Sequence, residues 1–143
     1  MKPIRVLIVD DSATMRRLIR SILEADQRLE IVGEAGTARE ARDAVNLYRP
    51  DVMTLDVEMP RMSGLEFLQR LMRHRPMPVV MVSTLTRRGS DVAIEAMSIG
   101  AVDCVEKPKL GGGLDSFSKL ADTVAAAARA RVNDPRRAGE ISV

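Results

Sequence analysis

The sequence predicts a doubly wound α/β fold, in which helices cover both faces of one parallel sheet. Short apolar runs rich in Val and Ile alternate with longer segments whose apolar residues recur every three or four positions. The apolar runs are nearly continuous, which is typical of strands that are buried on both faces. Acidic, hydroxyl or basic residues directly follow several of these runs. Ligand chemistry collects at such positions in parallel sheets.

Composition and charge exclude several classes of function. The 143 residues, 45% of them hydrophobic, fit one domain of ordinary size. The net charge is +2 and both signs are interspersed, which argues against a nucleic-acid-binding domain. No run approaches the ~20 apolar residues of a membrane-spanning helix, and no signal-peptide core follows the amino terminus. The single Cys104 excludes an internal disulfide and suits a reducing compartment. We therefore expect a cytoplasmic domain without nucleic-acid or membrane partners.

The first two strands and helices are expected between residues 4 and 48. Residues 4–9 form a β-branched run that ends at Asp10 and Asp11. Ser12 can cap a helix whose apolar positions have helical spacing: Met15, Leu18, Ile19, Ile22 and Leu23. The basic positions of this helix are expected to face solvent: Arg16, Arg17 and Arg20. Residues 29–34 alternate like a peripheral strand, and residues 37–40 have the capping-box spacing that begins a helix reaching about residue 48.

The central strand follows Pro50 and ends at Asp56. A loop punctuated by Pro60 and Gly64 comes next, and Ser63 has capping-box spacing for a third helix. An acidic residue at the carboxyl end of a parallel strand is a candidate nucleophile or metal ligand, although Asp also commonly begins turns.

Two more strands and helices complete the pattern. Residues 77–82 predict a buried strand that ends at Ser83 and Thr84, and a helix over about residues 90–99 stops at Gly100. Residues 102–106 predict a short strand that ends at Lys107. A flexible loop over residues 110–113 precedes a fifth helix, whose apolar stripe is Phe117, Leu120, Ala121, Val124, Ala125 and Ala128. The periodicity lapses after residue 132, so residues 1–132 are the predicted domain and 133–143 a predicted linker.

Right-handed crossovers favour a flavodoxin-like (βα)5 sheet of five parallel strands in the order 2-1-3-4-5. That order brings together the polar residues that follow four of the strands: Asp10, Asp11, Asp56, Ser83, Thr84 and Lys107. Crowded carboxylates raise one another's pKa unless a cation neutralises them, and one Lys is not enough for three acids. A divalent metal with oxygen ligands is implied, and Mg²⁺ fits. A metal ion, an ammonium group and a hydroxyl group together suit phosphoryl transfer.

These residues, with Met59, Pro60, Gly64 and Pro108, resemble the signature of response-regulator receiver domains over about residues 3–130. Residues 55–62 and 76–86 are similar, more narrowly, to the receivers of chemotaxis protein-glutamate methylesterases. The resemblance implies that Asp56 accepts a phosphoryl group from a chemotaxis histidine kinase. It also implies that Mg²⁺ is held by Asp10, Asp11, Asp56 and the Glu58 backbone carbonyl, and that the phosphoryl oxygens are contacted by Ser83 and Lys107.

The resemblance further implies that phosphorylation relieves inhibition of a methylesterase domain later in the parent chain, which acts on methylated chemoreceptors. No Gly-x-Ser-x-Gly nucleophile motif occurs in these 143 residues, so the methylesterase active site is expected elsewhere in the parent. Receivers usually carry an aromatic residue or His three positions before the Lys, and this chain has Cys104 there. We expect Cys104 to be a packing residue, with the signal carried by the loop over residues 84–90 and the helix after it.

Two alternatives share parts of the site. A receiver from a transcriptional or single-domain response regulator would have the same residues. A Mg²⁺ phosphatase of the haloacid dehalogenase type also uses an Asp nucleophile, but that family places a second Asp two positions later, where this chain has Glu58. Turnover of a simple phosphomonoester would favour the phosphatase, whereas a single stable phosphorylation would favour the receiver.

Overall fold

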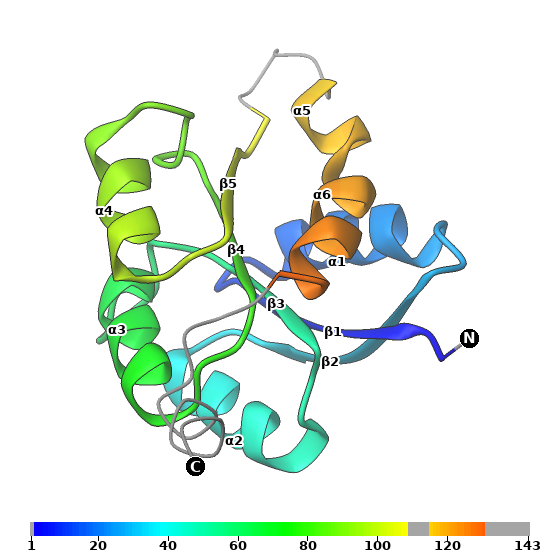
Figure 1. Ribbon diagram of the computed structural model, residues 1–143, viewed down its shortest axis with the longest axis horizontal. Coiled ribbons are helices and arrows are strands. Elements are labelled where there is room, and N and C mark those ends of the chain that lie inside the picture. Colours follow the sequence, from blue (N-terminus) through cyan, green and yellow to red (C-terminus); the bar gives the residue numbers. More distant parts are fainter. Residues whose placement is uncertain (1, 109–114, 131–143) are drawn as a thin grey trace, which may run out of the picture.

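Five parallel strands form one sheet in the order β2-β1-β3-β4-β5, as the sequence predicts (Figure 1). The computed structural model describes residues 2–108 and 115–130. The strands are β1 (Ile4–Val9), β2 (Leu29–Ala35), β3 (Val52–Leu55), β4 (Val79–Ser83) and β5 (Asp103–Glu106). The predicted fold class is confirmed.

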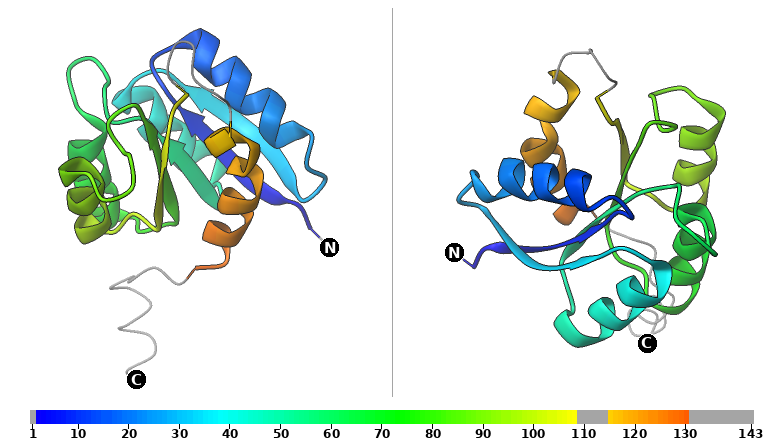
Figure 2. Two further views of the ribbon diagram at one scale, coloured as in Figure 1. Left: turned by 90° about the horizontal axis from the view of Figure 1, so that it is seen from above. Right: turned by 180° about the vertical axis from the view of Figure 1, so that it is seen from behind.

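Helices cover both faces of the sheet. They are α1 (Ala13–Glu24), α2 (Ala38–Tyr48), α3 (Gly64–His74), α4 (Asp91–Ile99), α5 (Asp115–Ser118) and α6 (Leu120–Ala128). The first and the last two lie on one face, while α2, α3 and α4 lie on the other (Figures 1 and 2). The predicted fifth helix is therefore two pieces. Lys119 separates them because its backbone, at φ −103° and ψ 4°, leaves the helical region.

Alternate residues of β1 pack into two hydrophobic cores, one on each face of the sheet. In β1, Val6 and Ile8 pack with the core under α1 and α6, whereas Leu7 and Val9 pack with the core under α2 and α3. All four are almost completely buried. Side chains in a strand point alternately to opposite faces, so a continuous apolar run is what a doubly covered strand requires.

Hydroxyl side chains begin four of the helices. Ser12, Thr37, Ser63 and Ser90 each accept a hydrogen bond from the backbone N–H three residues later. Such caps contribute about 1 kcal/mol each. The capping box of α2 differs from the expected one, because the Glu40 carboxylate accepts from the N–H of Gly36 instead of that of Thr37. At its other end, α4 stops before Gly100, as expected, and Gly100 has a positive φ of 141° that favours glycine.

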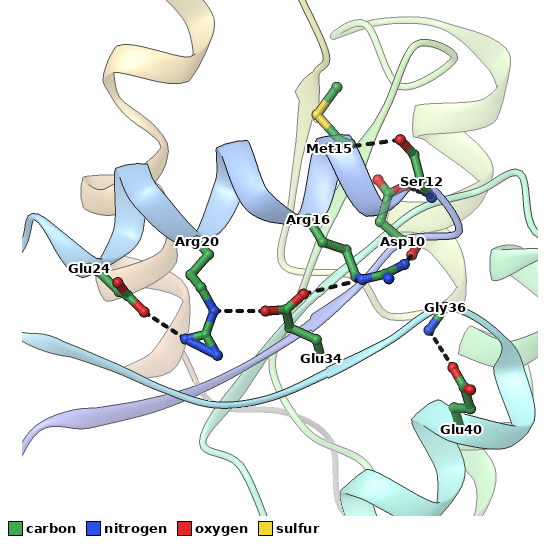
Figure 3. Close-up of polar contacts among 9 residues, drawn as sticks. All are labelled: Asp10, Ser12, Met15, Arg16, Arg20, Glu24, Glu34, Gly36 and Glu40. Carbon is green, nitrogen blue, oxygen red and sulfur yellow. Dashed lines mark hydrogen bonds and ion pairs between the residues drawn. The ribbon is translucent and has the colours of Figure 1, made fainter.

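The α1 arginines were expected to face solvent, and two of the three do so only in part. Arg17 is exposed, but Arg16 and Arg20 both form ion pairs with Glu34 of β2, at 3.2 and 2.7 Å (Figure 3). Residues four apart lie on the same side of a helix, and here that side faces β2. Arg20 also pairs with Glu24, at 2.6 Å. We call these four residues, Arg16, Arg20, Glu24 and Glu34, the α1–β2 network.

Two predicted segments, the loop over residues 110–113 and the linker over 133–143, lie outside the described residues. Among residues 2–108 and 115–130, no helix has the length and apolar character needed to cross a membrane.

Candidate functional site

Three carboxylates meet at the carboxyl ends of β1 and β3. The two strands pair in register, with Val9 beside Leu55, and the N–H of Asp56 donates to the Val9 carbonyl at 3.0 Å. Asp10 and Asp56 are therefore neighbours. One oxygen from each of Asp10, Asp11 and Asp56 lies within 4.8 Å of the others, and we call these residues the acidic cluster. Asp10 and Asp56 are 1% and 2% exposed, whereas the Asp11 side chain is exposed.

Lys107 reaches this cluster from the end of β5. Its backbone N–H donates to the Ser83 carbonyl at 3.0 Å, which continues the pairing of β4 with β5. Its ammonium nitrogen lies 2.6 Å from Asp10 Oδ2 and 3.3 Å from Asp56 Oδ1. Two buried carboxylates thus share one cation, as the strand order predicts.

The surroundings change the acidity of Asp56. Burial raises its pKa to about 6, and the nearby Asp10 carboxylate acts in the same direction. The Lys107 ammonium and a hydrogen bond from the Glu58 backbone N–H lower the pKa and offset part of that rise. The carboxylate is therefore mostly ionised at neutral pH and available as a nucleophile.

The oxygens of the acidic cluster suit a hard divalent cation. Asp10 Oδ2 and Asp56 Oδ1 are buried, and neither has a well-aligned hydrogen bond within the described part of the chain, despite the nearby ammonium. Buried oxygens of this kind are normally satisfied. Carboxylate ligands with an exposed third member match Mg²⁺, which keeps several waters. The residues present therefore fit the predicted metal.

The loop after Asp56 is tied to the start of α3. The N–H of Gly64 donates to the Val57 carbonyl at 2.7 Å, and a Cβ at Gly64 would overlap the Asp56 carbonyl oxygen. Only glycine fits there. Glu58 has an exposed side chain, and the assignment of its carbonyl as a metal ligand stays a prediction.

The end of β4 holds one hydroxyl that the sequence pattern did not single out. The predicted Ser83 is buried, and its Oγ accepts from the Leu85 N–H at 3.2 Å. Thr84 is exposed and does not join it. The fully buried hydroxyl belongs to Thr86, which accepts from the Ser83 N–H at 3.0 Å and donates to the Val105 carbonyl at 2.8 Å. Thr86 thus joins the β4–α4 loop to β5, and the run of three hydroxyl residues within residues 83–86 was its only signal in the sequence.

Cys104 lies at the edge of the core, half-buried against α4. Its sulfur is 3.9 Å from the Ala93 carbonyl oxygen. Burial raises the pKa of the thiol to about 11, so the reactive thiolate is scarce at neutral pH. The expected packing role is consistent with these surroundings.

Comparisons with known proteins agree with this geometry. Residues 6–114 match the family described as the response regulator receiver domain. A protein-glutamate methylesterase/protein-glutamine glutaminase of Agrobacterium fabrum is 58% identical over 127 residues, which are 89% of this chain and 36% of that protein. A protein of the same name from Bordetella parapertussis is 51% identical over 142 residues, 97% of this chain and 41% of the relative. The chain thus spans about two fifths of these relatives.

Solved structures show the same fold. The response regulator domain of Thermotoga maritima CheB superposes with a TM-score of 0.83 and 37% identity, covering 91% of this chain and 99% of that one. A chain of the CheX-CheY-BeF3-Mg²⁺ complex from Borrelia burgdorferi matches with a TM-score of 0.71 and 28% identity, covering 87% of this chain and 89% of that one.

Proposed function

Because this chain belongs to the response regulator receiver domain family, we propose that it is the phosphorylation-dependent regulatory domain of a chemotaxis protein-glutamate methylesterase. Asp56 is the phosphoryl acceptor, and a chemotaxis histidine kinase is the donor. The observation that carries the proposal is the position of Asp56 beside Asp10, Asp11 and Lys107, at the carboxyl edge of the sheet.

The chemistry follows from the charges of the site. An ionised Asp56 oxygen forms a bond to phosphorus, while the bond from phosphorus to the donor breaks: P–N in a phosphohistidine, P–O in acetyl phosphate. Lys107 can turn from the carboxylates toward the phosphoryl oxygens, since its ammonium already lies within 3.3 Å of Asp56. The Ser83 hydroxyl is the proposed second contact, after it leaves the Leu85 N–H.

Mg²⁺ would be held by Asp10, Asp11, Asp56 and the Glu58 carbonyl. When bound, it supplies positive charge that stabilises the crowded carboxylates and the negative charge of the transferred group. The Borrelia burgdorferi complex includes both Mg²⁺ and BeF3, and the likeness of that fold supports the same metal here.

The signal would leave the site through the β4–α4 loop. Phosphorylation adds up to about two negative charges, which can reposition Ser83 and Lys107. Thr86 joins the same loop to β5, so a shift of Ser83 would move both the loop and β5. In the full-length cytoplasmic parent, residues 133–143 would lead to the methylesterase domain, whose inhibition is relieved and whose targets are methylated chemoreceptors.

Labelling with acetyl phosphate tests the acceptor. Intact-protein mass spectrometry should show one Mg²⁺-dependent phosphoryl group per chain, absent with EDTA and absent from Asp56→Ala. Asp43→Asn is the matched control, because Asp43 is an exposed aspartate that pairs only with its neighbour Arg42 among the described residues. Full labelling of Asp56→Ala would contradict the assignment. Sustained turnover of p-nitrophenyl phosphate would instead favour the Asp-nucleophile phosphatase.

A further inference from the structure

Three of the four polar atoms of Asp10 form hydrogen bonds, and the fourth, Oδ2, lies beside the Lys107 ammonium. Its N–H donates to the Ala35 carbonyl of β2 at 2.9 Å, and its Oδ1 accepts from the Ser12 N–H at 2.9 Å. Its Oδ2 faces Lys107. The remaining atom is the backbone carbonyl oxygen, which accepts from Arg16 Nη1 at 2.6 Å (Figure 3).

Arg16 donates to the Asp10 carbonyl the hydrogen bond that a neighbouring strand would otherwise supply. The Val9 carbonyl, one residue earlier, accepts from the N–H of Asp56, which directly follows β3. The Asp10 N–H bonds Ala35, the last residue of β2, so the Asp10 carbonyl has no further strand N–H beside it and needs a partner from outside the sheet. The Arg16 guanidinium supplies it from the first turn of α1, with a side chain only 22% exposed.

The guanidinium is itself held by two further features. Its Nε donates to Glu34 Oε1 at 3.2 Å, which connects it to the α1–β2 network (Figure 3). Gly36 provides room beside it, because a Cβ there would lie 3.1 Å from Arg16 Nη1. The Gly36 N–H is in turn bound by Glu40 at 2.8 Å. A rigid, planar fork that bonds two fixed acceptors is a property of Arg that Lys lacks.

We propose that Arg16 is a positioning residue for the metal-binding acidic cluster, acting through the Asp10 carbonyl. The peptide that carries this carbonyl joins Asp10 to Asp11, so its orientation sets where the exposed Asp11 carboxylate points. Within the described part of the chain, the Arg16 guanidinium bonds this carbonyl and Glu34, and none of the three carboxylates of the cluster. Its effect is on the alignment of the Mg²⁺ ligands, and the inference therefore rests on the proposed function.

Mg²⁺ affinity of the whole chain, measured by isothermal titration calorimetry, tests this role. Residues that orient metal ligands typically contribute 10- to 100-fold to affinity, so Arg16→Gln should weaken Mg²⁺ binding about 10-fold. Arg16→Lys should fall between the Gln variant and the unaltered chain. Two controls remove the same charge from the same helix: Arg17→Gln, an exposed residue, and Arg20→Gln, which binds the same Glu34 without touching Asp10. Both should bind Mg²⁺ with the affinity of the unaltered chain, because neither contacts the Asp10 carbonyl.

A second variant leaves Arg16 in place. Gly36→Ala would push the guanidinium by a few tenths of an ångström, and we expect a smaller loss of Mg²⁺ affinity, about 2- to 3-fold. Circular dichroism spectra confirm that each variant is folded, and Gly36→Ala carries the test if Arg16→Gln does not fold. Arg16→Gln or Gly36→Ala binding Mg²⁺ as tightly as the Arg20→Gln control would overturn this role. Absence of Mg²⁺ binding and labelling in the unaltered chain would overturn the proposed function itself.

Discussion

The acidic cluster with Lys107 and the α1–β2 network are built from the same kinds of side chain but differ in burial and balance. The network has two basic and two acidic residues, with side chains 22 to 52% exposed. Around Lys107, two almost fully buried carboxylates face one ammonium. Water screens the network, whereas burial strengthens every interaction in the cluster.

The difference shows what each region can do. Exposed ion pairs contribute about 0–1 kcal/mol each, so the network mainly holds α1 against β2. In the cluster, burial and, after it, the nearby Asp10 carboxylate raise the pKa of Asp56, and the excess negative charge costs stability. That same excess gives the site its expected affinity for a divalent cation. Arg16 is the residue that contacts both regions, through Glu34 and through the Asp10 carbonyl.

The largest expected effect is a loss of stability on replacing Gly64, beside the acidic cluster, compared with Gly36, beside the network. Gly64→Ala should destabilise the fold by about 4 kcal/mol or more, because the new Cβ would overlap the rigid Asp56 backbone. Gly36→Ala, beside the network, should cost less than about 1 kcal/mol, since its tightest contact, 3.1 Å from Arg16 Nη1, is with a side-chain end and is relieved by a shift of a few tenths of an ångström. Urea unfolding followed by circular dichroism measures both. If the two variants unfolded at similar urea concentrations, the backbone around Asp56 would be as able to move as the side chains around Gly36.

A second comparison removes one cation from each region. Lys107→Ala leaves two buried carboxylates without their cation and should destabilise the metal-free protein by about 3 kcal/mol at neutral pH. Arg20→Ala, in the network, should cost less than about 1 kcal/mol. Thermal unfolding in EDTA tests both. Equal losses of stability in Lys107→Ala and Arg20→Ala would show that burial does not strengthen the ion pairs of the cluster over those of the network.

The smallest effect concerns pH. The folded-state pKa of Asp56 is raised from 3.8 to about 6, so the native state binds more protons than the unfolded state between these values, and stability falls as pH rises through this window. In EDTA, Asp56→Asn should be more stable than the unaltered chain by about 1 kcal/mol above pH 6. The advantage should vanish near pH 4 and shrink in Mg²⁺. Melting temperatures across the window provide the measurement, and a constant difference at all pH values would be the contrary result.

Local patterns in the sequence predicted the acidic cluster well. Each of Asp10, Asp56 and Lys107 directly follows a strand, and a parallel sheet necessarily brings the ends of neighbouring strands to one edge. The helix caps were equally local, because a hydroxyl side chain reaches the N–H three residues later without help from the rest of the fold.

The network could not be predicted in the same way. Whether Arg16 meets solvent or Glu34 depends on how α1 sits against β2, and the helical period alone does not contain that information. The same holds for Arg28, which pairs with Asp122 from α6 at 2.6 Å. Thr86 was missed because its partners, Ser83 and Val105, come together only when β4 pairs with β5. Side chains whose partners are distant in sequence are visible only in the assembled fold.

The position of Lys107 at the end of the last strand also bears on synthesis of the chain. Asp10 and Asp56 are translated first, and at about 5–20 residues per second Lys107 follows Asp56 by roughly 3–10 s. Until β5 joins the edge of the sheet beside β4, the buried carboxylates have no ammonium between them. A nascent chain therefore contains Asp10 and Asp56 before it contains the complete site, which assembles only after Lys107 has been added.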